Sequence, residues 1–176
     1  MRNLGLLVLC LCLASCTGVP EAIVAVTPFD QERYLGQWYE VARIENRFEE
    51  GLEHVTATYT LRDDGGINVL NQGYSEAQQS WQKAEGKAYF VDSPSTAHLK
   101  VSFFGPFYAS YIVFKLDPSY RYAFVTGNTK EYLWLLARTP TVSDEIKQEF
   151  LQEADARGFA LGQLVWVEQQ IPRPVQ

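Results

Sequence analysis

Apolar and polar residues alternate in short runs over most of the chain, and turn residues separate one run from the next. The runs TATYTL at 56–61 and INVLNQGY at 67–74 are joined by the turn RDDGG. Such a pattern predicts a β-hairpin, because a period of two is typical of half-buried strands and Asp-Gly favours a tight turn. We count eight strands of this kind between Gly36 and Arg138, each joined to the next by a short turn. The expected fold is all-β: an up-and-down antiparallel barrel, which with eight strands can hold one small ligand.

A single helix is expected after the last of these strands. Ile146, Phe150 and Ala154 repeat at a spacing of four and form one apolar stripe. Thr141, three residues before Asp144, resembles the start of a capping box. We therefore expect a C-terminal helix packed on the outside of the barrel, followed by a short final strand in LVWVE. The barrel and helix are assigned to 31–170, and 171–176 to a tail.

The N-terminal residues have the pattern of an export signal. Arg2 precedes an apolar run from Leu4 to Leu13, which is too short to span a bilayer as a helix, since this requires about 20 residues. The run ends in LASC, which resembles the bacterial lipobox, where the cysteine becomes the first mature residue and carries the lipid. We predict a signal peptide at 1–15, cleavage before Cys16, and a lipidated N-terminus and tether at 16–30. The alternative is an ordinary signal peptide with a chance cysteine.

The composition narrows the range of activities and partners to expect. The chain has 21 acidic and 15 basic residues and no basic run, which argues against a nucleic-acid partner. Two of its three cysteines lie in the leader. If Cys16 is lipidated, the mature domain has no disulfide, no cysteine nucleophile and no thiolate metal site. His54 and His98 are in neither metal-ligand nor triad spacing, so we expect no enzyme activity, no cofactor and no metal.

Two motifs give the chain a family resemblance. YLGQWYEVAR places Gly36 and Trp38 at the start of the first strand, and LWLLARTP ends the eighth strand with Arg138. A Gly-x-Trp that opens an eight-stranded meander closed by an arginine resembles the lipocalin family. The stretches GLEHVTATYTLRDDGG, GKAYF and LKVSFFGPFY resemble its bacterial outer-membrane lipoprotein branch, over about residues 30–170. The middle lipocalin motif, usually Thr-Asp-Tyr, is replaced here by TGNTKEY.

The motif residues also have a physical role. Gly36 permits a backbone turn that a side chain would block. Trp38 is large enough to plug one end of a barrel, and Arg138 can lie over its indole ring as a cation–π contact. We interpret all three as structural, with ligand contact by Trp38 as the alternative.

Alternation from the closed end then predicts which residues face the lumen. On the sixth strand, Ile112 and Phe114 are expected inside rather than Tyr111. Small inward residues, including Gly86, predict a cavity; the alternative is that they are fitted against large neighbours. Glu40 also points inward and must be paired or protonated, and we favour a structural role over ligand contact. The expected cavity lining is Ala42, Val55, Ala57, Tyr59, Val69, Asn71, Ala88, Phe90, Val101, Phe103, Ile112, Tyr132 and Trp134.

The segment VSFFGPFYASYIVF, at 101–114, is interrupted by Gly105 and Pro106, which places several rings on the loop between the fifth and sixth strands. We expect a rim at the open end made of Phe104, Phe107, Tyr108 and Tyr111. Such a rim suits an acyl-chain ligand, a membrane surface or a second copy of the chain. Packing of the rings on one another is the alternative.

The resemblance implies a lipid-binding protein that transports or stores fatty acids or lysophospholipids for envelope maintenance. It implies an outer-membrane location through a lipid anchor, with the domain facing the periplasm. A ligand headgroup would lie at the rim, near Arg43, Arg47, Lys83 or Lys130. The alternative is an envelope interaction or structural lipoprotein that uses the aromatic rim as a protein or membrane contact. A homodimer through the open end is compatible with either function.

Overall fold

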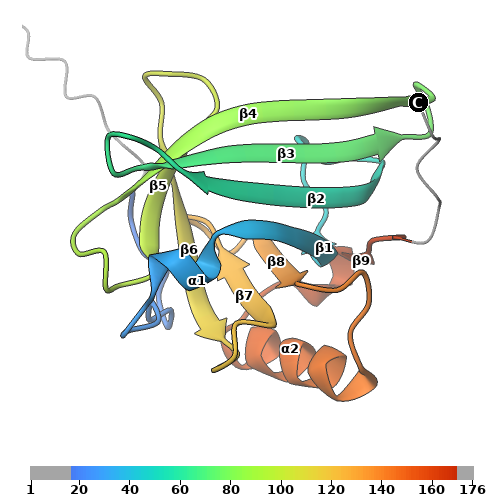
Figure 1. Cartoon of the computed structure of the whole chain (residues 1–176). Helices are drawn as coiled ribbons and strands as arrows, with labels where there is room; N and C mark the ends of the chain where they lie inside the picture. Colours follow the sequence, from blue (N-terminus) through green and yellow to red (C-terminus); the bar gives the residue numbers. More distant parts are fainter. Residues whose placement is uncertain (1–16, 170–176) are drawn as a thin grey trace, which may run out of the picture.

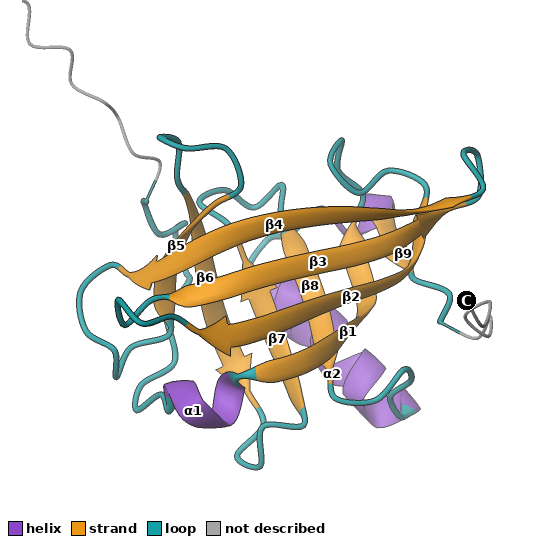
Figure 2. Ribbon diagram, turned by 45° about the horizontal axis from the view of Figure 1, so that its top comes forward, coloured by secondary structure: helices purple, strands orange, loops and turns teal. Residues whose placement is uncertain are grey.

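The computed structural model describes residues 17–169, so the predicted signal peptide, Cys16 and the tail 171–176 lie outside the described residues. The described chain forms one antiparallel sheet in the order β2-β3-β4-β5-β6-β7-β8-β1-β9, closed by pairing of β2 with β1 (Figures 1 and 2). This confirms the predicted up-and-down barrel and its eight strands. The elements are α1 (Gln31–Tyr34), β1 (Gly36–Ile44), β2 (Leu52–Leu61), β3 (Ile67–Ser75), β4 (Ser80–Phe90), β5 (His98–Ser102), β6 (Ala109–Leu116), β7 (Tyr122–Thr126), β8 (Leu133–Ala137), α2 (Asp144–Ala156), η1 (Leu161–Gln163) and β9 (Leu164–Trp166).

The predicted hairpin between β2 and β3 forms because its turn satisfies its own polar groups. The carboxylate of Asp64 accepts hydrogen bonds from the Gly66 amide at 3.0 Å and from the Arg62 guanidinium, and these bonds lower its pKa. Gly65 has φ +81°, a conformation that side chains rarely adopt. The turn therefore sets the register of both strands.

Helix α2 covers the outer face of the sheet beneath β7 and β8 (Figure 1). Phe150 and Ala154 are buried and Ile146 is partly buried, which confirms the predicted apolar stripe. The helix begins at Asp144 with Ser143 as its N-cap, whereas Thr141 had been expected to start a capping box. A second apolar core, which we call the outer cluster, thus lies between the barrel wall and α2.

The seam between β1 and β2 closes the barrel, and its two halves are built differently. Near α1, the two strands pair directly over 36–39 and 56–59. Beyond that point both strands have an irregular register, and β9 replaces β2 beside residues 42–44 of β1. The barrel wall here is therefore completed by the C-terminal part of the chain.

Residues 167–169, which we call the C-terminal strap, cross the part of the seam that lies farther from α1. The Val167 amide donates to the Val41 carbonyl at 2.9 Å, and the His54 amide donates to the Glu168 carbonyl at 2.8 Å. Nε2 of Gln169 donates to the carbonyls of Glu40 and Val55, at 2.8 and 2.9 Å. The strap thus bonds to both β1 and β2 where these strands no longer bond to each other.

The predicted tether lies against the barrel from Thr17 onward. The Ser110 hydroxyl donates to the Gly18 carbonyl at 2.8 Å, and the Val26 amide donates to the Val113 carbonyl at 2.9 Å. Ile23 is buried in the outer cluster, and Phe29 is buried at the end of the barrel that α1 covers. This segment therefore fixes where the N-terminal end of the chain leaves the barrel.

Candidate functional site

The barrel is closed at one end by the predicted motif residues. Trp38 is fully buried, and its indole N–H donates to the Tyr34 carbonyl at 2.9 Å. The Arg138 guanidinium carbon lies 3.8 Å from the indole ring centroid. Arg138 also donates to the carbonyls of Gln37 and Leu35, each at 2.9 Å, so it closes the end of α1 and the start of β1 together. A side chain at Gly36 (φ +92°) would adopt an unfavourable backbone conformation, which explains the glycine.

Three tyrosine hydroxyls meet on the lumen side of this closed end. The Tyr111 hydroxyl lies 2.7 Å from that of Tyr34 and 3.0 Å from that of Tyr59. Tyr59 is on β2 and Tyr111 on β6, which are four strands apart in either direction around the barrel, so the group spans the lumen. Burial raises the pKa of all three hydroxyls, which therefore stay neutral. We call this group the tyrosine crossbar.

Tyr111 was expected on the rim, and this placement was wrong. On β6 the expected register was inverted: Tyr111 and Val113 pack in the lumen, whereas Ile112 and Phe114 lie in the outer cluster. The reason is the pairing of β5 with β6, in which Leu99 is opposite Tyr111. Cross-strand partners face the same side of a sheet, so an inward Leu99 directs Tyr111 inward.

Ala42, like Ile112, was expected in the cavity lining but does not face the lumen. Alternation holds from Trp38 to Glu40, but a bulge between Glu40 and Ala42 inserts one residue into β1. An inserted residue inverts the faces of everything after it. Ala42 therefore lies in the outer cluster, and Arg43 points into the lumen in its place.

The remaining expected lining residues lie where alternation places them. Val55 is buried beside Gly73, Asn71 is paired with Ala57, and Tyr132 stacks on Trp134 with ring centroids 5.8 Å apart. Contact of any of these residues with a ligand stays a prediction. The apolar core inside the barrel, together with the partly buried side chains packed against it, is called the lumen cluster here. It includes eight of the expected residues: Ala57, Tyr59, Val69, Ala88, Phe90, Val101, Phe103 and Trp134.

The small residue Gly86 does not leave an empty space. A Cβ added there would lie 2.8 Å from the Phe103 ring and 2.7 Å from the Ser102 carbonyl oxygen. Gly86 is thus fitted against a large neighbour, which was the alternative interpretation of the small inward residues.

The upper part of the lumen remains accessible. Val101, Phe103, Tyr111 and Trp134 pack against the lumen cluster but are only partly buried. Ala84, which alternates with the inward Ala88 on β4, is exposed. Inward-facing residues keep exposed surface only if solvent reaches the interior, so the barrel has an open end above the tyrosine crossbar.

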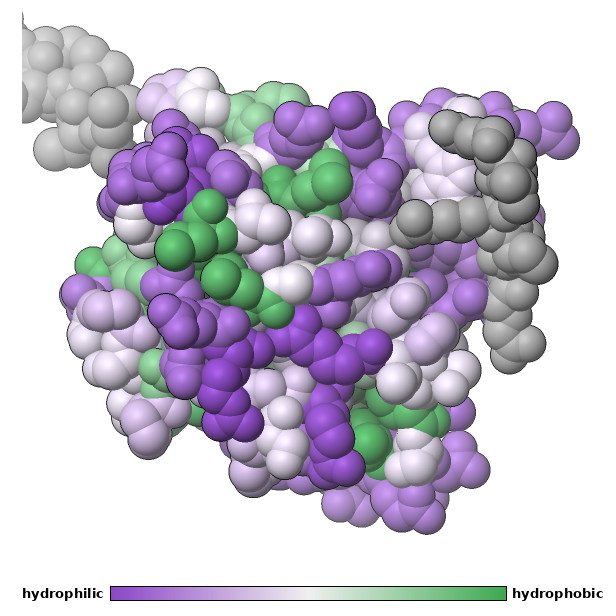
Figure 3. Space-filling model, viewed as in Figure 1, coloured by the Kyte–Doolittle hydropathy of each residue, from purple (hydrophilic) through white to green (hydrophobic). Residues whose placement is uncertain are grey.

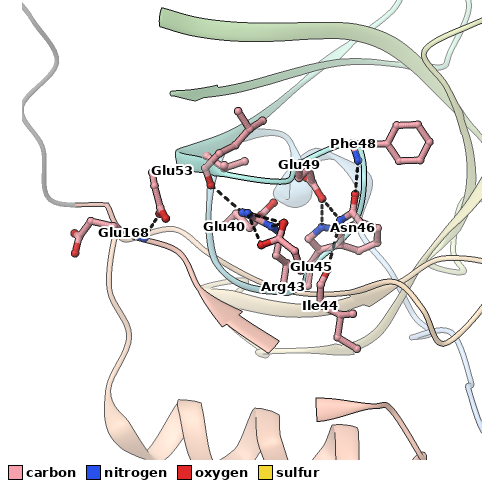
Figure 4. A network of polar contacts seen from close by, with 12 residues as sticks. Glu40, Arg43, Ile44, Glu45, Asn46, Phe48, Glu49, Glu53 and Glu168 are labelled. Atoms are coloured by element: carbon pink, nitrogen blue, oxygen red, sulfur yellow. Dashed lines mark hydrogen bonds and ion pairs between the residues drawn. The ribbon is translucent and has the colours of Figure 1, made fainter. Parts of the chain in front are cut away.

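A buried ion pair lies inside this open end (Figure 4). Arg43 is 1% exposed, and its guanidinium donates to Glu40 Oε1 at 3.0 Å and to the Leu52 carbonyl at 3.1 Å. It also contacts both carboxylate oxygens of Glu45. The Arg43 guanidinium is therefore bonded to partners within the protein. This geometry does not support its expected role beside a ligand headgroup at the rim.

Glu49 completes the network from the loop between β1 and β2. Its Oε2 accepts hydrogen bonds from the Trp134 indole at 3.0 Å and from Asn46 Nδ2 at 2.6 Å, while Phe48 beside it points away from the network (Figure 4). The sequence did not identify Glu49, because loop residues have no alternation that predicts their direction. The loop over the open end is thus held to the lumen wall by one carboxylate.

Burial and the neighbouring Glu49 raise the pKa of Glu40 well above its usual value, and Arg43 offsets only part of this effect. The folded protein therefore holds a proton on Glu40 at pH values where the unfolded chain has lost it. This contribution to stability is full below the unfolded pKa of about 4.3 and is lost as pH rises towards the folded pKa.

We expect Glu40→Gln to gain stability relative to the native protein as pH rises through this window, because the variant has no proton to lose. Denaturant unfolding at a series of pH values measures the difference. Glu85→Gln, which removes an exposed carboxylate on β4, is the matched control. A Glu40→Gln difference that stays constant with pH would contradict the assignment.

The loop between β5 and β6 carries the most exposed rings of the predicted rim. Phe104 is 75% exposed and Phe107 73% exposed. Tyr108 is partly buried, with the Lys100 ammonium 5.4 Å from its ring centroid. The alternative interpretation, in which the rim rings pack on one another, is therefore not supported for either phenylalanine.

The outer surface of β2, β3 and β4 has a different character from the lumen. In the view of Figure 3 it is mostly hydrophilic, with hydrophobic residues in small separate groups. An open hollow of about 500 Å³ is lined by polar residues such as Thr58, Asn68 and Lys87, together with Val69, Gly86 and Phe103. Among residues 17–169, no group of three or more His, Cys, Asp or Glu side chains is placed to hold a metal ion.

Comparison with known proteins agrees with this architecture. The lipocalin-like domain family matches residues 29–169. The chain is 59% identical to the outer membrane lipoprotein Blc of Citrobacter freundii over 150 residues, 85% of each chain. It is 53% identical to the outer membrane lipoprotein Blc of Vibrio cholerae over 171 residues, 97% of this chain and 100% of that protein.

Solved structures support the fold alone. Insecticyanin from the tobacco hornworm Manduca sexta superposes with a TM-score of 0.68 at 17% identity, over 86% of each chain. Lobster apocrustacyanin A1 superposes with a TM-score of 0.65 at 16% identity, over 87% of this chain and 94% of that chain. The chain therefore belongs to the lipocalin family, within the branch of the bacterial outer membrane lipoproteins.

Proposed function

We propose that the protein binds the acyl chain of a fatty acid or lysophospholipid in the lumen, and carries or stores it at the outer membrane. The observation that carries this proposal is the lumen wall above the tyrosine crossbar. Val101, Phe103 and Trp134 face inward there and keep exposed apolar surface. Burial of such a surface against methylene groups is favourable by about 0.8 kcal/mol for each CH₂ removed from water.

The open end defines how such a ligand would lie. Glu40, Arg43 and Glu49 are bonded to one another or to the wall, and no unpaired cation faces the lumen among the described residues of this network. A charged headgroup in the lumen would lose its hydration without gaining an ion pair, which is costly. The acyl chain therefore enters first, and the headgroup stays at the mouth.

The lipid anchor and the location belong to the same proposal. The relatives from Citrobacter freundii and Vibrio cholerae are named outer membrane lipoproteins, and this chain has a lipobox-like LASC ending at Cys16. Within residues 17–169, no helix is long and apolar enough to cross a bilayer. Acylation of Cys16 with more than one chain would give stable attachment.

Direct binding tests the proposal. The domain from Thr17 onward is purified, co-purified lipid is identified by mass spectrometry, and palmitate and lysophospholipid are titrated against tryptophan fluorescence. We expect saturable one-site binding, weakened about tenfold or more by Phe103→Ala, since loss of a buried phenyl contact removes about 1.5–3 kcal/mol. Trp134→Phe should weaken binding less and reduce the signal.

Leu61→Ala is the matched control, because Leu61 is 57% exposed and is not part of the lumen cluster. The absence of co-purified lipid and of saturable binding would refute the proposed function. The exposed Phe104 and Phe107 would then favour an envelope contact protein without a lumen ligand.

A further inference from the structure

Exposed apolar side chains lie on two segments that the hydrogen bond between Ser110 and Gly18 holds together. Val19 lies on the N-terminal segment, and Phe104 and Phe107 lie on the loop before β6. Both Figures 1 and 2 show the beginning of the described chain beside the β5–β6 loop. We call these three residues the anchor-side patch.

The length of chain outside the described residues fixes the distance to the lipid anchor. The Ser110 hydroxyl holds the Gly18 carbonyl at 2.8 Å, and only two residue steps separate Gly18 from Cys16. An extended chain spans at most about 3.6 Å per residue, so an acylated Cys16 lies within about 7 Å of Gly18. Phe107 is three positions before Ser110, so a bilayer that holds the anchor comes close to the loop.

The chemistry of this region suits a lipid surface. Aromatic rings are favoured at the level of the lipid headgroups, and Lys100 over Tyr108 adds a positive charge at the base of the loop. The stretch from Lys100 to Phe114 contains no acidic residue, although the whole chain has 21. An anionic membrane would therefore not repel this loop, whereas the N-terminal segment beside it carries the exposed Glu21.

We propose that the anchor-side patch rests on the outer membrane, with Phe104 and Phe107 inserted among the lipid headgroups. The lipid anchor then holds the barrel in one orientation instead of leaving it free to rotate. Phe103, next to Phe104 in sequence, lies in the lumen cluster. The inserted loop thus connects the membrane surface with the wall of the lumen.

Site-specific labelling of the full-length lipidated protein tests this orientation. Acylation occupies Cys16 and the leader is removed, so Phe107→Cys supplies a single reactive thiol for the fluorophore NBD. Leu61→Cys, at an exposed apolar position beside the β2–β3 turn at the other end of the barrel, is the matched control. The proteins are placed in vesicles of phosphatidylethanolamine and phosphatidylglycerol that contain a headgroup-proximal spin-labelled lipid.

We expect the label at position 107 to be several-fold brighter in vesicles than in detergent-free buffer, and to be quenched by the spin-labelled lipid but not by aqueous iodide. The label at position 61 should stay accessible to iodide. Equal iodide quenching at both positions would overturn the proposal, as would failure of the protein to float with the vesicles. Shielding of position 107 without vesicles that increases with protein concentration would overturn it in favour of a second copy. None of these outcomes depends on whether the lumen binds lipid.

Discussion

Replacement of Arg43 by methionine is expected to lower the free energy of unfolding by about 3–5 kcal/mol, because it leaves buried partners unsatisfied. The guanidinium is 1% exposed and supplies donors to Glu40, Glu45 and the Leu52 carbonyl. Methionine fills a similar volume but offers no donor. Urea or guanidinium unfolding followed by tryptophan fluorescence measures the loss.

A double variant tests whether the stability lost by Arg43→Met comes from unsatisfied polar partners or from altered packing. Glu40→Leu combined with Arg43→Met replaces the pair by apolar side chains, and an apolar replacement of a buried ion pair is often neutral. We expect the double variant to recover a large part of the stability lost by Arg43→Met alone. Lys83→Ala, which removes one member of an exposed pair with Glu85, should change stability by less than about 1 kcal/mol. A double variant no more stable than the single one would show that the pair is not the source of the effect.

Replacement of Trp38 by alanine is expected to cost about 3–5 kcal/mol, because the fully buried indole closes the barrel floor. The variant loses the packing of the indole on Tyr34, its hydrogen bond to the Tyr34 carbonyl and the contact with Arg138. Thermal or denaturant unfolding monitored by circular dichroism measures the effect.

Trp166→Ala provides a control of the same residue type. Trp166 lies on β9, is 42% exposed, and makes an edge contact with Phe150. Its loss should be clearly smaller than that of Trp38. If the two variants lose equal stability, the floor of the barrel is not held by Trp38 in the way that its burial indicates.

The sequence predicted the parts of the fold that repeat a local pattern. Strand alternation, the hairpin turn at Asp64 and the stripe at Phe150 each depend on neighbouring residues, so they could be recognised without the tertiary structure. The Trp38–Arg138 contact was predicted because both residues occupy positions typical of the family.

The errors arose where one residue changes the side that all later residues face. The bulge after Glu40 turned Ala42 outward and Arg43 inward, and no local pattern marks a bulge. On β6, the aromatic residues gave no clear alternation, so the direction of Tyr111 depended on its pairing with Leu99 of β5. Register across strands is a long-range property, and a one-residue slip inverts it.

Contacts between distant segments were also beyond sequence reasoning. The tyrosine crossbar joins residues from α1, β2 and β6, and Glu49 reaches Trp134 from a loop 85 positions earlier. Glu40 was correctly expected to be buried and to need a partner, but the identity of that partner depended on the bulge that turned Arg43 inward. Paired polar groups inside a barrel are therefore specified by the whole fold.

The C-terminal strap has a consequence for the time at which the barrel can form during synthesis. Strand β1 is made early, yet one of its edges pairs with β8, made more than ninety residues later. Its other edge pairs with β2 only over 36–39 and is covered beyond that by β9 and residues 167–169, at the end of the described chain. A ribosome-bound chain thus lacks the partners that complete its first strand, and contacts so distant in sequence form slowly. If the predicted export signal at 1–15 is used, such a delay would favour a translocating chain that has not yet folded.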